Sequence, residues 1–127
     1  MFTHICVGSN DLARSKSFYD AIFSAAGGTA TASDPASGRL MYEHKGGRLV
    51  VLTPNNGETA SFANGGTIGL HMDTPEMVEA WHAAGVAAGG TTCENPPGIR
   101  SMPGRELYLA YLRDPDGNKL CGAHPVA

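Results

Sequence analysis

Three side chains that can ligate zinc, His4, His71 and Cys121, stand on segments whose apolar pattern predicts β-strands. A catalytic zinc ion takes about three protein ligands, and imidazole and thiolate both suit it. His4 and Cys121 supply two, so His71 is the best candidate for the third. It stands on the same face of its strand as Thr67, but roughly 13 Å further along. The three side chains would therefore meet only if that strand is bulged or a partner chain supplies one ligand.

The same residues have a second interpretation, in which no metal binds. Free cysteine is often buried and packs as a small apolar residue, and no basic residue is clearly placed to activate Cys6 or Cys121 as a nucleophile. His4 would then be a cavity histidine that is hydrogen-bonded to a neighbour. We favour this interpretation and keep the zinc site as the alternative. The other histidines are interpreted as solvent-exposed residues of a hairpin, a helix face and the C-terminal tail: His44, His82 and His124.

An internal repeat predicts how these residues are arranged. The segments 4–29 and 67–91 each hold a short apolar strand, a capped amphipathic stretch and the ending Ala-Ala-Gly-Gly-Thr. The segments 40–51 and 110–121 continue the match. Two βαβββ units in one short chain predict an α+β fold with a pseudo-symmetric sheet around a cavity. The modules span residues 1–54 and 66–127 of a single domain, joined by the loop 55–65, which is rich in Asn, Gly and Ser.

Capping and turn residues set the expected elements. Ser9 or Asn10 caps a helix that ends at Gly27, and Thr74 caps a second helix with Pro75 at its first position. The apolar side of each helix should pack on the sheet. A hairpin is expected at 45–47, a loop over 94–104 and a tight turn at 114–118. The expected strands are 3–8, 29–32, 39–43, 48–53, 67–72, 106–112 and 119–123.

Composition and charge exclude several classes of partner. The chain has 127 residues and a formal net charge of −3, and its Lys and Arg are scattered, which argues against nucleic acid and membrane surfaces. No apolar run approaches the ~20 residues that a membrane-spanning helix needs. Three cysteines without CxxC spacing, and an N-terminus without a signal-peptide pattern, are typical of the reducing cytoplasm. The sequence therefore predicts a cytoplasmic domain that needs no disulfide.

Motifs at both ends of the chain resemble those of the vicinal oxygen chelate superfamily, which includes glyoxalase I, bleomycin-resistance proteins, fosfomycin-resistance enzymes and extradiol dioxygenases. They are His-Ile-Cys-Val at 4–7, Asp-Leu at 11–12, Ser-Lys-Ser-Phe-Tyr at 15–19, and Tyr-Leu-Arg-Asp-Pro-Asp-Gly-Asn-Lys-Leu at 111–120. The resemblance implies a half-open eight-stranded cup and a homodimer. In metal-using members, each module supplies one ligand from its first strand and one from its last. The bound ion stabilises an enediolate or a similar oxyanion of the substrate.

The four positions that match this ligand set are His4, Val51, Thr67 and Cys121. Only His4 keeps the usual ligand type, because valine has no lone pair and a threonine hydroxyl is a weak neutral donor. The resemblance therefore implies a bleomycin-resistance-like protein that binds an unidentified small molecule in its cup, with the metal quartet largely lost and no cofactor. The expected pocket wall consists of His4, Cys6, Val51, Thr67, Gly69, His71 and Cys121.

Arg100 is a further candidate for ligand binding. It closes the stiff segment Pro-Pro-Gly-Ile-Arg, where members of the superfamily often place a cover over the ligand. A guanidinium there could clamp a carboxylate or phosphate. The other interpretation of Arg100 is a solvated surface residue.

Catalysis is the alternative function. The protein would then be a lyase, isomerase or dioxygenase of the same superfamily, with a divalent metal such as zinc or with a cavity histidine as acid–base catalyst; glyoxalase I activity is not expected. Glu43 and Glu106 are candidate bases if they point inward. Tyr108 and Tyr111 lie at odd spacing on one strand, so at most one of them lines the cup.

Overall fold

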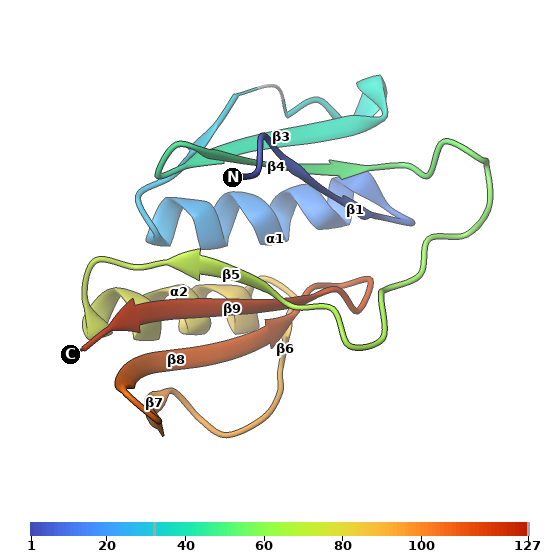
Figure 1. Ribbon diagram of the computed structural model, residues 1–127. Helices are drawn as coiled ribbons and strands as arrows, with labels where there is room; N and C mark the ends of the chain where they lie inside the picture. Colours follow the sequence, from blue (N-terminus) through green and yellow to red (C-terminus); the bar gives the residue numbers. More distant parts are fainter. Residues whose placement is uncertain (32, 127) are drawn as a thin grey trace.

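Two similar modules, βαβββ and βαββββ, make up residues 1–31 and 33–126, which this computed structural model describes (Figure 1). The N-terminal module consists of β1 (Ile5–Gly8), α1 (Leu12–Ala25), β2 (Thr29–Ala30), the 3-10 turn η1 (Pro35–Ser37), β3 (Arg39–His44) and β4 (Gly47–Leu52). The C-terminal module consists of β5 (Ile68–His71), α2 (Pro75–Ala87), β6 (Thr91–Thr92), β7 (Gly98–Met102), β8 (Arg105–Arg113) and β9 (Lys119–Pro125). The predicted α+β fold is confirmed. Ala32, at the end of the strand expected over 29–32, lies outside the described residues.

Each module has its own sheet, and the two sheets share one plan. The strand order is β1-β4-β3-β2 in the first sheet, where β1 is parallel to β4. It is β5-β9-β8-β6 in the second, where β5 is parallel to β9. Figure 1 shows the first sheet above the second, with the linker between the modules passing along one side. β1 and β5 are therefore edge strands of their own sheets.

β7 corrects the prediction of a loop over residues 94–104. It pairs antiparallel with β8 through a tight turn, in which Gly104 has a φ of 80°. Pro96 and Pro97 precede the strand, and Pro103 lies in the turn, so none of the three has to donate a hydrogen bond to the ladder. The extra strand gives the second sheet five strands against four in the first.

Capping side chains fix the start of both helices. α2 begins as predicted, with Thr74 as N-cap and Pro75 at the first helical position. α1 is capped by Asp11 rather than by Ser9 or Asn10, because the Asp11 carboxylate accepts a hydrogen bond from a backbone N–H of the first turn at 3.1 Å. Within the described residues, neither helix combines the length and the apolar character that crossing a membrane requires.

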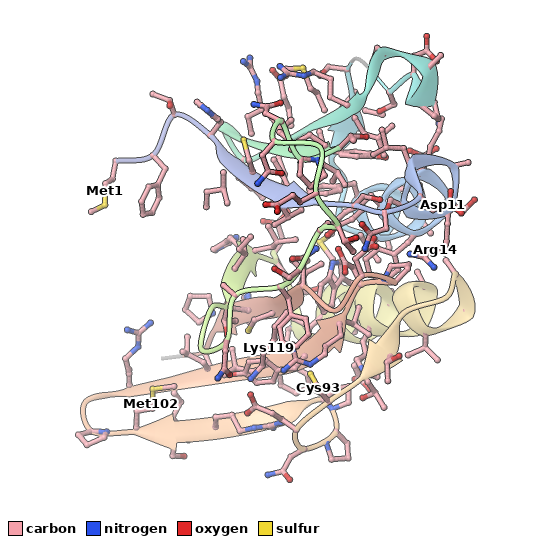
Figure 2. The ribbon with its side chains drawn as sticks, turned by 90° about the vertical axis from the view of Figure 1, so that its right-hand side faces the viewer. Met1, Asp11, Arg14, Cys93, Met102 and Lys119 are labelled. Carbon is pink, nitrogen blue, oxygen red and sulfur yellow. The ribbon has the colours of Figure 1, made fainter. Side chains whose placement is uncertain are left out.

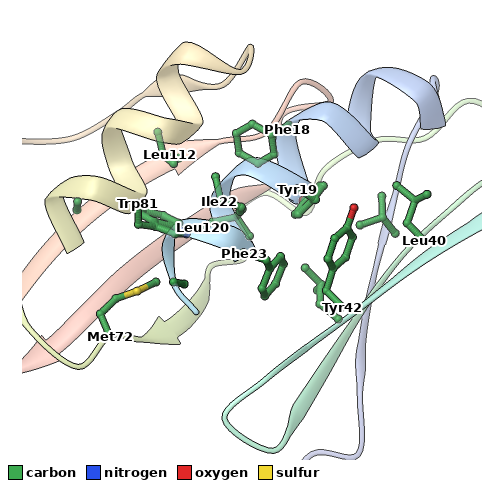
Figure 3. Packing of buried hydrophobic residues seen from close by; sticks show 14 of the residues in the cluster. Phe18, Tyr19, Ile22, Phe23, Leu40, Tyr42, Met72, Trp81, Leu112 and Leu120 are labelled. Carbon is green, nitrogen blue, oxygen red and sulfur yellow. The ribbon is translucent and has the colours of Figure 1, made fainter. Parts of the chain in front are cut away.

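The two helices pack against each other and against one face of each sheet, which creates a single core (Figure 3). The helices come close at Gly85, where an added Cβ would lie 2.3 Å from Leu112 Cδ1 and 3.1 Å from Ile22 Cγ2. Trp81 lies in this core, as its helical spacing predicts. The largest fully buried side chains are Trp81, Tyr19, Tyr42, Phe18 and Ile22. Shared burial of both helices holds the modules side by side.

A buried acidic turn joins the modules at one end. The Asp114 carboxylate, 3% exposed, accepts hydrogen bonds from Tyr19 Oη (2.5 Å), the N–H groups of Asp116 and Asn118 (2.9 Å each) and Asn118 Nδ2 (2.8 Å). Burial and then the Asp114 charge raise the pKa of Tyr19, so its phenol keeps the proton. Asn118 Nδ2 also donates to the Gly8 carbonyl at 3.0 Å. These contacts fasten the C-terminal module to β1 and α1, and we call Tyr19, Asp114, Asp116 and Asn118 the Asp114 cluster.

Candidate functional site

The edges of β1 and β5 face each other between the modules, and we call the boundary along residues 4–8 and 67–71 the seam. Among the described residues, no backbone hydrogen bond joins these two strands. Each of two hollows along the seam is lined by residues of both strands. Strand edges without a hydrogen-bonded neighbour present free N–H and C=O groups. The seam therefore offers a ligand both space and backbone polar groups.

The larger hollow along this boundary, which we call the seam cavity, has a volume of about 350 Å³. It lies where β1 begins and β5 ends. Its apolar lining belongs to the core or packs against it: Ile5, Phe23, Tyr42, Leu49, Ile68 and Leu70. The rest of its lining is Met1, Phe2, His4, His44, Lys45, Gly46, Gly47, Arg48, Gly69 and His71. An apolar wall with a few polar groups is the usual composition of a small-molecule site.

Two stacked aromatic rings, of Phe23 and Tyr42, lie in the core directly behind the seam cavity. The rings of Phe23 and Tyr42 are 4.8 Å apart between centroids and 9° from parallel. His44 meets Phe23 edge-on, with 6.2 Å between the ring centroids. The Tyr42 hydroxyl donates to Asp20 at 2.7 Å, and burial and then this hydrogen bond raise the pKa of Tyr42. Tyr42 is fully buried and its hydroxyl is engaged, so it supports the cavity lining from the core.

Two contacts bridge the seam beside the cavity. His44 Nε2 lies 2.6 Å from the His71 carbonyl oxygen, and because a carbonyl only accepts, Nε2 carries the proton and donates it. Lys45 forms an ion pair with Asp73, which lowers the pKa of that carboxyl. The β3–β4 hairpin of the first module is thereby tied to the end of β5 in the second. This hairpin closes one side of the seam cavity.

The second hollow, of about 300 Å³, lies at the other end of the seam near the linker. Cys6 and Thr67 line it together with Asn118 and Lys119. Lys119 forms an ion pair with Glu94, and this contact raises the pKa of Lys119. The charge at this end is therefore neutralised within the C-terminal module. We call this site the linker-end hollow.

The structure separates the predicted pocket residues into three groups. His4, Gly69 and His71 line the seam cavity. Cys6 and Thr67 line the linker-end hollow instead. The remaining predicted residues, Val51, Arg100 and Cys121, are absent from the lining of both hollows, as far as the described residues define it. The predicted wall is therefore not one continuous pocket.

The prediction that Val51 lines the cup is wrong. Val51 is fully buried in the core, on the face of the sheet that packs against the helices. Cys6 of β1 pairs with Val50, just as Gly69 of β5 pairs with Cys121. The repeat partner of Cys121 is therefore Val50, and a one-residue shift in a strand places a side chain on the opposite face. Since both residues are valines, the correction leaves this position without a metal ligand.

Cys121 lies opposite Tyr111 on the face of the second sheet turned away from α2. It is 7% exposed, and burial raises the pKa of its thiol to about 11. The thiol is therefore protonated at neutral pH, as expected for a buried packing residue rather than a nucleophile. Arg100 is a half-buried residue of β7, and its Nη2 donates to the carbonyls of Asn95 and Pro96 at 2.9 Å each. Its guanidinium therefore binds the backbone of the loop that precedes β7.

The donor set does not fit the superfamily's metal chelate. By strand register the four equivalent positions are His4, Val50, Thr67 and Cys121, which supply one imidazole, one hydrocarbon, one neutral hydroxyl and one thiol, with no carboxylate. His71 does not complete a zinc site with His4 and Cys121. Across residues 1–31 and 33–126, no three His, Cys, Asp or Glu side chains lie close enough to hold an ion.

Several cavity residues were missed by sequence reasoning. Phe23 and Tyr42 have the spacing of core residues, and both are buried in the core directly behind the cavity. Lys45 and Arg48 lie on a hairpin that carries no motif. The predicted solvent exposure of three histidines is also wrong, since each is half-buried and hydrogen-bonded: His44 to the His71 carbonyl, His82 to Thr92 and His124 to the Met72 carbonyl.

Comparison with known proteins gives one consistent result. Residues 2–121 match the model of the Glyoxalase/Bleomycin resistance protein/Dioxygenase superfamily. A glyoxalase/bleomycin resistance protein from Albidiferax ferrireducens T118 is 49% identical, covers 98% of both chains and superposes with a TM-score of 0.87. A glyoxalase-related enzyme from Fulvimarina pelagi (22% identity, TM-score 0.72, 98% of this chain and 87% of that one) has the same fold. So does lactoylglutathione lyase from Agrobacterium tumefaciens (20% identity, TM-score 0.66, 98% and 90%). No curated protein matches the chain.

Proposed function

Because the chain belongs to the Glyoxalase/Bleomycin resistance protein/Dioxygenase superfamily, we propose that it binds a small molecule in the seam cavity without the superfamily's metal chelate. The observation that carries the proposal is the contrast between cavity and ligands. A cavity of about 350 Å³ lies between the modules. Of the four chelating positions, in contrast, His4 alone has a side chain that commonly binds metal in this superfamily. The chain thus resembles a superfamily member that sequesters its ligand.

The composition of the cavity supports this function. Its volume falls at the small end of the range of about 300–1,000 Å³ that is usual for ligand pockets. The half-buried side chains of Ile5, Ile68 and Leu70 supply its accessible apolar wall. Such a wall favours a compact molecule with an apolar part, because removing apolar surface from water contributes about 25 cal/mol per Å².

An acid–base enzyme is the second candidate, because the imidazoles of His4 and His71 line the same cavity as its apolar side chains. A histidine lyase or isomerase would turn over its substrate and lose that turnover in His4→Gln while still binding. The sequestering protein proposed above would show binding without turnover in both forms.

Metal content and a blocked cavity test the proposal together. Protein purified without a metal-affinity tag and then offered zinc, iron, manganese or nickel is expected to retain less than one ion per chain. Stoichiometric metal that is lost in His4→Ala would contradict the proposal. For the cavity, the neutral probe 1-naphthamide is expected to bind the wild type measurably in isothermal titration calorimetry.

Gly69→Leu is the matched blocking variant. An added Cβ at Gly69 meets no heavy atom of the described residues within 4 Å, and Gly69 has no strained φ, so a larger side chain can enter the space without disturbing the fold. Binding of 1-naphthamide is expected to be lost in Gly69→Leu and retained in Ala83→Leu, which adds the same side chain on the exposed side of α2. Equal binding by both variants would show that the probe binds elsewhere.

A further inference from the structure

Gly69 stands at a place where neither packing nor backbone conformation requires a glycine. An added Cβ at this residue meets no heavy atom of the described residues within 4 Å, and its φ does not lie in the left-handed region. Glycine inside a strand weakens the strand, and it often marks a place that a ligand or another backbone approaches closely. Gly69 lines the seam cavity. A ligand in this cavity can therefore reach a backbone that no side chain covers.

Strand pairing shows which backbone groups of β5 point into the seam. The N–H of Met72, which follows β5, donates to the Ala123 carbonyl of β9 at 2.7 Å. Successive residues of a strand point their N–H and C=O groups to opposite edges, so Leu70 also points to β9 and Gly69 points to the seam. In the part of the chain that the structure describes, neither backbone group of Gly69 has a backbone partner on that side.

The free groups of Gly69 form a pair of one donor and one acceptor. In an extended strand, the N–H and C=O of one residue lie side by side and point the same way. A ligand satisfies both when its own N–H and C=O lie side by side, as in a primary amide, a lactam or a cyclic imide. We call this group a cis-amide. A ketone lacks the donor, and an ammonium group lacks the acceptor.

The lysine and the arginine that line the cavity are already paired, which favours a neutral ligand. Arg48 Nη2 donates to Glu43 at 3.1 Å, and Lys45 forms its ion pair with Asp73. Each cation thus faces one anion, and the two pairs carry no net charge. A neutral amide needs neither pair to separate.

We propose that the ligand of the seam cavity carries a neutral cis-amide, which pairs with the N–H and C=O of Gly69. The inference rests on the binding function proposed above and adds the chemical class of the ligand. The paired groups lie in the plane of the sheet, between its two faces, so the ligand does not have to cross the sheet. Its apolar part contacts the half-buried side chains of Ile68 and Leu70, the neighbours of Gly69 along the strand.

A matched pair of neutral probes tests the amide. 1-Acetonaphthone has the shape of 1-naphthamide, but a methyl group replaces the NH₂ group. Calorimetric titration is expected to show about tenfold or tighter binding of 1-naphthamide, because the ketone leaves the Gly69 carbonyl without a donor. Equal or tighter binding of the ketone would overturn the inference, since burial of apolar surface alone favours the ketone.

Hydrogen exchange locates the contact without a variant. The N–H of Gly69 is expected to exchange about tenfold or more slowly when 1-naphthamide saturates the protein. Cys6 is the control, because it is the repeat partner of Gly69 and its N–H also points into the seam, but it lines the linker-end hollow. Slower exchange at Cys6 with no change at Gly69 would contradict the pairing.

A proline variant removes the donor. Gly69→Pro deletes an N–H that is not donated to β9, so the strand ladder is kept. It should weaken 1-naphthamide about tenfold or more. Thr67→Pro is the matched control, because it deletes an N–H of the same edge at a residue that lines the linker-end hollow. Equal affinity of the two variants for 1-naphthamide would count against the pairing.

The outcomes separate this inference from the proposed function. If the amide and the ketone bind equally and Gly69→Leu abolishes both, the seam cavity binds ligands but the amide class is wrong. If neither probe binds, or if Gly69→Leu leaves both unchanged, the binding function fails and the inference with it. Tighter binding of 1-naphthamide, with slower exchange at Gly69 and not at Cys6, supports both.

Discussion

The two modules meet at two very different places, and the contrast explains how the chain keeps an open cavity inside a firmly joined fold. At one place the Asp114 cluster is buried, and its carboxylate is surrounded by hydrogen-bond donors from both modules. At the other, β1 and β5 stand apart along the seam, and the half-buried His44 and the exposed Lys45–Asp73 pair bridge the gap. Figure 2 places Arg14, which contacts Asp116, on the opposite side of the molecule from Met1 at the seam cavity.

The difference shows that one set of contacts fixes the relative orientation of the two modules, and that another set borders the seam cavity. The helices and the Asp114 cluster fix how the modules sit, because buried contacts contribute most of the stability of a domain. The seam does not have to hold the modules together, so its strand edges can stay unpaired and accept a ligand. Variants at the Asp114 cluster should therefore act on stability, and variants at the seam on binding.

The largest effect is expected for Asp114→Ala. It removes the acceptor of several buried donors, including the Tyr19 hydroxyl at 2.5 Å. Leaving these donors unsatisfied should lower the free energy of unfolding by about 3 kcal/mol or more, measured by urea denaturation. Asp20→Ala is the matched control, because Asp20 also accepts from a tyrosine but is partly exposed. An equal loss in the two variants would erase the contrast between the Asp114 cluster and the surface.

A glycine pair gives the next largest effect. Gly85→Ala adds a Cβ that would lie 2.3 Å from Leu112 Cδ1 in the packed helix junction. It should lower the free energy of unfolding by about 1–3 kcal/mol through overpacking. Gly69→Ala places the same methyl group in open space at the seam. It should be neutral or stabilising by a few tenths of a kcal/mol, because alanine loses less backbone entropy than glycine on folding. A comparable loss of unfolding free energy in Gly69→Ala would show that the space beside Gly69 is already filled.

A smaller effect is expected for the Lys45–Asp73 ion pair across the seam. Both side chains are close to half exposed, so solvent screens the attraction. A double-mutant cycle with Lys45→Ala and Asp73→Ala should give a coupling energy below about 1 kcal/mol that falls further at high salt. A coupling of several kcal/mol would mean that the seam, and not only the Asp114 cluster, holds the modules together.

The smallest effect is expected for alkylation of Cys121. Burial raises the pKa of this thiol to about 11, so little thiolate forms at pH 8 and the site is covered. Iodoacetamide should modify the exposed Cys6 and leave Cys121 unmodified until the protein is unfolded, as peptide mass spectrometry can show. Modification of Cys121 first would contradict its assignment as an unreactive buried residue.

Much of the fold could be predicted from local signals. The repeated strand-and-helix pattern, the Thr74 cap and the hairpin at 45–47 each depend on a few neighbouring residues. The Asp-Pro-Asp-Gly-Asn turn was also predictable as a turn. Its main role was not, because Asp114 meets Tyr19, which lies 95 residues away in the sequence. Such a contact follows from the packing of two modules, which no local pattern contains.

The site was less predictable, for a reason that particular residues make clear. His4, Gly69 and His71 could be assigned because they alternate with core residues on their strands. Val51 was misassigned because the second half of the repeat is offset by one residue, and an offset of one reverses the face of a strand. Phe23 and Tyr42 were missed because a residue that packs in a core and a residue that lines a cavity beside that core have the same pattern.

Backbone amide chemical shifts during titration with 1-naphthamide test the central claim most directly, because they locate the ligand without relying on a variant. We predict saturable shifts for residues of the seam cavity, above all Ile5, Gly47 and Gly69, with little change around Cys121 and Tyr111 on the outer face of the second sheet. Shifts centred on Cys121 and Tyr111, with the seam residues unchanged, would contradict the claim that the open seam is the binding site.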